Sequence, residues 1–146
     1  MPSFIKEWFS WFEKGMDQID QKEKEKFFSI CGRHCAETGI VKLYKDTYDQ
    51  TCGNFDLFIN KYINKMKYVG GKVISPGKIY EITFPDCYCE LYNKGYVQTD
   101  VICECSRQSI LHILRTFNNE LEYEVERISS VLNGDKECCF RVTIVK

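Results

Sequence analysis

Cys31, His34 and Cys35 lie within about one helical turn and are the residues best suited to chemistry. Two thiolates and an imidazole can bind one tetrahedral zinc ion if another element adds a fourth ligand. Cys105 is the candidate for that position, and Cys103 is its alternative. Zinc is therefore the cofactor that this set predicts, with Cys31, His34, Cys35 and Cys105 as its ligands.

The same residues have two other interpretations. Cys31 and Cys35 continue an apolar stripe that begins at Phe27 and Phe28, and the two Cys-x-x-Cys pairs typical of zinc sites are absent. Packing in a core therefore explains them as well. In the third interpretation, His34 raises the thiolate fraction of a neighbouring cysteine, as a catalytic nucleophile requires. The spacing leaves packing, zinc binding and catalysis open.

This segment is also the best candidate for a ligand site. Arg33 adds a guanidinium, and Gly32 permits close approach of another group. Most other cysteines fall on a predicted sheet face, and His112 lies among aliphatic helix residues. The expected ligand-binding residues are Cys31, Arg33, His34, Cys35 and Cys103.

The first half of the chain must position this segment on helices. Apolar residues recur at spacings of three and four, which is the helical period. Asp20 with Glu23 has the spacing of a capping box, and Gly39 ends the helix that follows. Asn54 can cap a later helix, which two glycines end. Helices are expected over residues 4–19, 20–39, 40–48 and 54–70.

The second half shows the alternation of strands. Turn signals at Pro76-Gly77, Asn93-Lys94-Gly95 and Asn133-Gly134 separate the strands. Ser106 can cap a helix that runs to Phe117. Strands are expected over residues 73–74, 79–84, 86–92, 96–105, 121–131 and 137–145.

Together these elements predict an α+β fold. N-terminal helices pack on an antiparallel sheet, and one further helix is inserted between the C-terminal strands. A length of 146 residues with 44% hydrophobic content suits a single domain over residues 1–146. Residues 1–70 form its helical part and residues 71–146 its sheet-rich part.

Strand register predicts which cysteines are buried. If Tyr92 pairs with Tyr96 across a hairpin, the odd-numbered residues of both strands share one apolar face. A two-residue turn at Asn133-Gly134 pairs Glu126 with Arg141 on the outer face. The first register buries Cys87, Cys89, Cys103 and Cys105, and the second buries Cys138 and turns Cys139 outward.

The stretch from Thr99 to Ile144 carries a family resemblance, through Cys103-Glu104-Cys105, helix 109–117, strand 121–126 and the run 134–141. It resembles the C-terminal half of four-vinyl-reductase-like domains and of the related L-2-amino-thiazoline-4-carboxylic acid hydrolase-like proteins. The resemblance implies a small α+β domain that binds a small molecule, as a hydrolase or as a sensor, with zinc-binding cysteines in some members. Ser129 stands where the pattern favours a cysteine, which weakens a zinc role for Cys138.

Composition narrows the partners and the compartment. The chain has 20 Lys and Arg against 21 Asp and Glu, so nucleic acid is not an expected partner. Charged residues interrupt the apolar N-terminal stretch, which argues against an export signal or a membrane span. With an odd count of nine cysteines, we expect reduced thiols and a cytoplasmic protein.

Two functions remain open, and the sequence does not decide whether the protein is an enzyme. The first is a small-molecule-binding domain, with hydrolysis of an amino-acid-derived or heterocyclic compound as its candidate reaction. The alternative is a non-enzymatic zinc- or thiol-based sensor or interaction module. A closed metal site would favour the alternative, and a buried apolar pocket the first. The apolar residues Trp8, Phe9, Trp11 and Phe12 exceed one helical stripe, so a homodimer is also expected.

Overall fold

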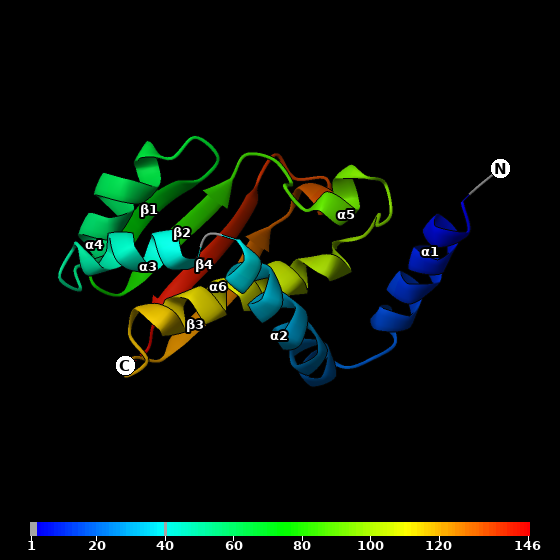
Figure 1. Ribbon diagram of the computed structural model, residues 1–146, viewed down its shortest axis with the longest axis horizontal. Helices are drawn as coiled ribbons and strands as arrows, with labels where there is room; N and C mark the ends of the chain where they lie inside the picture. Colours follow the sequence, from blue (N-terminus) through cyan, green and yellow to red (C-terminus); the bar gives the residue numbers. More distant parts are fainter. Residues whose placement is uncertain (1–2, 40) are drawn as a thin grey trace.

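A computed structural model describes residues 3–39 and 41–146. The chain forms the expected α+β fold, with helices packed on a four-stranded antiparallel sheet (Figure 1). The sheet order is β1-β2-β4-β3. Its strands are β1 (Gly70–Ser75), β2 (Ile79–Phe84), β3 (Tyr123–Ser129) and β4 (Cys138–Ile144).

The first three helices follow the sequence pattern, but the helix expected over residues 54–70 forms only in part, because regular α-helix ends at Leu57 and Gly70 already begins β1. The helices of the first half are α1 (Phe4–Asp17), α2 (Gln21–Thr38), α3 (Val41–Asp49) and α4 (Phe55–Leu57). The Asp20 side chain accepts a hydrogen bond from the Glu23 amide at 2.9 Å, which confirms the predicted cap of α2. The Asn54 side chain caps α4 in the same way, through the Leu57 amide. Ile40, predicted to begin the third helix, lies outside the described residues.

The helix after Asn54 has an irregular continuation that the sequence pattern does not predict. It widens into a π-helix, η1 (Phe58–Tyr62), and then tightens into a 3₁₀ turn, η2 (Ile63–Lys65). Single π-turns occur often at functional sites. This irregular segment packs beside β1, and its apolar side chains enter the main core.

The predicted hairpin over residues 86–105 is wrong. These residues form a short helix, α5 (Glu90–Asn93), a 3₁₀ turn, η3 (Asp100–Ile102), and the start of α6 (Cys103–Phe117). Gly95 has a φ of +78°. Its amide donates to the Tyr92 carbonyl, and the Tyr96 amide donates to the Leu91 carbonyl, both at 2.9 Å. This pair of bonds is the Schellman motif that ends a helix, so the glycine belongs to a helix end and not to a hairpin.

Because no such hairpin exists, the predicted face with four aligned cysteines is absent as well. Cys87 and Cys103 are buried as expected, but Cys89 and Cys105 are only half-buried. Cys87 and Cys89 precede α5, whereas Cys103 and Cys105 lie on the first turn of α6. Helix α6 begins at Cys103 and not at Ser106, because η3 leads directly into it.

The pairing of the two C-terminal strands is largely as predicted. Glu126 pairs with Arg141 across β3 and β4, although the connection includes a 3₁₀ turn, η4 (Val131–Asn133), before Gly134. Cys138 is buried as expected. Cys139 is also buried, contrary to the prediction, because β4 is a central strand and its neighbours β2 and β3 flank Cys139 on both sides.

The buried apolar residues form two clusters. The main cluster lies between the sheet, α3, α4, η1 and α6, and it includes the stacked rings of Tyr48 and Phe117. The smaller cluster is centred on Phe28, Val97 and Ile102, and α1 contributes partly buried side chains to it. Helix α6 packs against β3 on one side and against α2 on another. Within the described ranges, no helix has the length and apolar character to cross a membrane.

Helix α1 lies at one end of the molecule (Figure 1). The buried carboxylate of Glu13 attaches this helix to the segment before α6. Glu13 has only 4% of its surface exposed. Its carboxylate accepts hydrogen bonds from the amides of Gln98 at 2.9 Å and Thr99 at 2.6 Å, and from the Thr99 hydroxyl. These donors satisfy the buried charge, which would otherwise be costly.

Replacing Glu13 with Gln should detach α1 locally. The amide group cannot accept at both of its ends, so at least one backbone donor loses its charged partner, at a cost of about 1.5 to 3 kcal/mol. Hydrogen exchange should show faster exchange of the amides of residues 4–17 in Glu13→Gln. Glu7→Gln, an exposed change on the same helix, is the control. Equal protection of α1 in both variants would contradict this role.

Candidate functional site

Helices α2 and α6 cross at Gly32, and this crossing organises the region that carries the predicted site. A Cβ atom on Gly32 would lie 2.7 Å from the Cys105 carbonyl oxygen and 2.8 Å from the Ser109 nitrogen. The Ser109 hydroxyl donates to the Gly32 carbonyl at 3.0 Å. Gly32 is therefore needed for close approach of a helix and not of a ligand.

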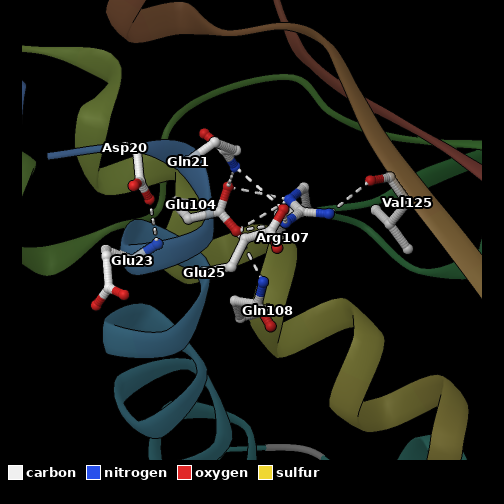
Figure 2. Close-up of polar contacts among 8 residues, drawn as sticks. All are labelled: Asp20, Gln21, Glu23, Glu25, Glu104, Arg107, Gln108 and Val125. Carbon is white, nitrogen blue, oxygen red and sulfur yellow. Dashed lines mark hydrogen bonds and ion pairs between the residues drawn. The ribbon is translucent and has the colours of Figure 1, made fainter.

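A polar network fixes the first turn of α2 against α6 and β3 (Figure 2). Arg107 donates to both carboxylate oxygens of Glu104, to Glu25 and to the Val125 carbonyl. Gln21 also donates to Glu104, at 3.1 Å. Burial acts to raise the pKa of Glu104, but hydrogen bonds from Arg107 and Gln108 lower it below its usual value.

One side of the crossing brings three thiols together. Cys31 and Cys35 are exposed on α2, and Cys105 is half-buried on α6. Burial raises the pKa of Cys105 to about 12, and the nearby Cys35 and Cys31 contribute in the same direction. Cys105 is therefore a neutral thiol at physiological pH and not a ready nucleophile.

Cys103 lies apart from this group, in the interior at the start of α6. Its sulfur is 3.2 Å from the hydroxyl oxygen of the fully buried Ser130. Burial raises the pKa of Cys103 to about 11, and Cys138 and Cys87 are its thiol neighbours. In residues 3–39 and 41–146, no group of three or more Cys, His, Asp or Glu side chains is arranged to hold a metal ion. The geometry thus lends no support to the zinc set Cys31, His34, Cys35 and Cys105.

Arg33 and His34 lie in a groove with residues of α6, which we call the α2–α6 groove. Glu37 also lines it, and its carboxylate is 2.6 Å from Nε2 of His112. His112 is therefore a groove residue, although its aliphatic neighbours in the sequence suggested otherwise. The groove is lined by Ser29, Ile30, Arg33, His34, Glu37, Gln108, His112 and Arg115.

A second concavity, the apolar cavity, lies inside the main core. It has a volume of about 70 Å³. Among its lining residues, only Tyr44 carries a polar side-chain atom. Several lining residues, such as Ile110 and Ile113, are only half-buried, so the cavity reaches the surface. It is lined by Tyr44, Phe55, Phe58, Ile63, Val69, Ile82, Phe84, Ile110, Ile113, Leu114 and Phe117.

The structure thus divides the predicted site residues among three places: the exposed thiols beside Cys105, the groove with Arg33 and His34, and the interior with Cys103. Sequence reasoning missed the α6 half of the groove. The spacing of His112 and Arg115 by three residues was a usable signal, because it puts both on one helix face. No signal marked the apolar cavity, since its residues have the pattern of an ordinary core.

Comparisons with known proteins leave the family of this chain unassigned. No family model matches the sequence, and no curated protein matches it. Among solved structures, the chain is similar to trafficking protein particle complex subunit 3 from Naegleria fowleri, which is described as covalently bound to palmitic acid. The identity is 17%, the TM-score is 0.46, and the match covers 97% of this chain and 93% of that one. A TM-score at this level does not establish a common fold.

Replacing Gly32 with Ala should push α2 and α6 apart. Because backbone atoms of α6 lie under 3.0 Å from the new methyl group, we expect a loss of about 1 to 3 kcal/mol in the free energy of unfolding. Gly15→Ala is the matched control, since Gly15 is also helical and has no atom within 4 Å of its added Cβ. That variant should gain up to about 1 kcal/mol. Equal changes in urea denaturation would contradict a tight crossing.

Proposed function

We propose that this protein binds a slender apolar group of a small molecule in the apolar cavity. The observation that carries the proposal is a cavity of about 70 Å³ whose lining is apolar except for one tyrosine. Small-molecule sites are concave and largely apolar, with a few polar groups that orient the ligand. This arrangement supports the small-molecule-binding domain expected from the sequence, for which an apolar pocket is the favourable feature.

Empty space in a protein core lowers the free energy of unfolding, so a cavity that is retained suggests a function such as ligand binding. Protein interiors are close-packed, and residual space costs about 24 cal/mol per Å³. For a cavity of 70 Å³ that opens to the surface, this cost is at most about 2 kcal/mol, which better packing by larger side chains would remove. A ligand that fills the space recovers this stability.

The size of the cavity selects the ligand. An apolar cavity of about 150 Å³ accepts benzene, so one of half that volume favours a narrower group such as an unbranched alkyl chain. Burial raises the pKa of Tyr44, so its hydroxyl stays protonated. Within the described part of the chain, no hydrogen-bond partner reaches this hydroxyl. It can therefore orient the polar end of a ligand at the edge of the cavity.

A hydrolytic role has less support. The lining residues of the apolar cavity include no Cys, His, Ser or carboxylate that could serve as nucleophile or base. The resemblance to four-vinyl-reductase-like domains stays a prediction, because no family model matches the sequence. It supports the same class of function, since that resemblance also implies a small α+β domain that binds a small molecule.

Binding can be tested with 1-octanol as the probe, by methyl NMR and calorimetry. Only the slender end of its alkyl chain enters the 70 Å³ cavity, and the rest of the molecule extends to the open edge. In the wild-type protein, methyl signals of Ile82, Ile113 and Leu114 should shift together. Ile113→Phe fills part of the cavity and should weaken binding by about tenfold, equivalent to about 1.4 kcal/mol.

Two further variants make the test decisive. Ile128→Phe adds the same volume at an exposed position on β3 and should leave octanol affinity unchanged. Ile113→Ala enlarges the cavity, so it should also accept benzene, which the wild-type protein should exclude. Equal octanol binding by wild type and Ile113→Phe, with both folded by thermal melting, would rule out the apolar cavity as the site.

We also propose that α1 mediates a homodimer. Phe4, Ile5, Trp8 and Trp11 are about half exposed or more, whereas Phe9 and Phe12 pack inward on the smaller cluster. Aromatic side chains gathered on one exposed helix face mark an association surface, and a second copy presents the same face.

Light scattering at tens of micromolar protein should give twice the chain mass of 17.2 kDa. The double change Trp8→Ser and Trp11→Ser should give the monomer, because it removes the exposed aromatic area. Leu43→Ser, an equally exposed apolar position on α3, should remain dimeric. A wild-type monomer at these concentrations would contradict the homodimer.

A further inference from the structure

We propose that the α2–α6 groove is a second binding site, which takes a phosphate monoester. The groove is separate from the apolar cavity and does not depend on the function proposed for it. Its volume is about 530 Å³, in the range of small-molecule sites. Unlike the apolar cavity, it is lined mainly by charged and polar side chains from both helices.

Two guanidinium groups of the groove have no carboxylate partner among the described residues and can bind an anion. Arg107, Arg127 and Arg141 each pair with a carboxylate elsewhere in the fold. In the part of the chain that the structure describes, no carboxylate pairs with Arg33 or Arg115. These two arginines come from different helices and line the same concavity. Arginine presents a planar array of donors that matches phosphate oxygens, so two such groups can bind different edges of one anion.

The charged residues of the groove also favour an anionic ligand. Glu37 is its only carboxylate, and its Oε1 lies 2.6 Å from Nε2 of His112. The Glu37 carboxylate is therefore engaged by His112, and both arginines can bind a ligand. His34 adds an imidazole on the α2 side. The groove therefore has an excess of hydrogen-bond donors and positive charge over acceptors.

Charge and the number of acceptor oxygens favour phosphate over a carboxylate as the ligand of the groove. A phosphate monoester carries a charge of about −1.5 to −2 and has three acceptor oxygens, enough to bind two guanidinium groups and an imidazole together. A carboxylate has two oxygens and one charge, which a single arginine can satisfy. Ile30, with 74% of its surface exposed, lies on the groove and offers apolar contact to the organic part of an ester.

Phenyl phosphate and inorganic phosphate are suitable probes, at low ionic strength because exposed charges are screened by salt. Titration followed by NMR should shift the side-chain Nε–H signals of Arg33 and Arg115. Phenyl phosphate should bind more tightly than inorganic phosphate, because only the ester contacts Ile30. No saturable shift with either probe in the millimolar range would overturn the proposal.

Substitutions inside and outside the groove distinguish a specific phosphate site from general attraction of the anion to a positively charged surface. Arg33→Gln and Arg115→Gln should each weaken phenyl phosphate binding at least about fivefold. Arg141→Gln removes the same charge outside the groove and should leave the affinity within about twofold. Glu37→Gln should tighten binding, since it removes the opposing carboxylate. An equal loss in Arg141→Gln, or no loss in both groove variants, would overturn the assignment, with thermal melting used to show that each variant is folded.

The same phosphate group can be soluble or part of a lipid, and one more measurement distinguishes these sources. Vesicles that contain phosphatidic acid present a phosphate monoester at a surface. Sedimentation with these vesicles, lost in Arg33→Gln, would assign the lipid source. Binding of phenyl phosphate without sedimentation would assign a soluble ligand.

Discussion

The close crossing of α2 and α6 is the constraint on which the arrangement of the candidate site residues depends. Gly32 allows the two backbones to meet, and the Ser109 hydroxyl joins them through the Gly32 carbonyl. Side chains project in different directions around a helix axis. Residues adjacent in the sequence of α2 therefore have different surroundings at the crossing. Cys31 and Cys35 lie near Cys105, whereas Arg33 and His34 line the groove.

Charge and apolar surface are separated on two sides of α6, so this one helix lines both the apolar cavity and the α2–α6 groove. Ile110 and Leu114 face the apolar cavity, while His112 and Arg115 face the groove. The network around Arg107 keeps the helix in this orientation, since it connects α6 to the first turn of α2 and to β3. Breaking one partner of such a partly buried pair costs more than the pair itself contributes, so the network is effective at specifying position.

The hairpin predicted at residues 86–105 was wrong because a short turn motif is compatible with more than one structure. Asn93-Lys94-Gly95 predicted a hairpin because a glycine with positive φ is common to tight turns. The same backbone conformation also ends helices, and here Gly95 completes a Schellman motif after α5. At Asn133-Gly134 the similar signal did join two strands, and the predicted pairing of Glu126 with Arg141 was correct. The local residues are alike in the two places, and only the packing of the flanking segments distinguishes them.

The sequence by itself determined the fold class, the first three helices, the caps at Asp20 and Asn54, and the pairing of β3 with β4. These features depend on periodicity and on contacts between residues near in sequence, which are readable from one chain. Only the tertiary structure decided which reactive side chains meet, because that depends on the angle and distance at which distant helices pack. Gly32, interpreted from sequence as room for a ligand, proved to be room for α6, and that contact separated the thiols beside Cys105 from the groove residues Arg33 and His34.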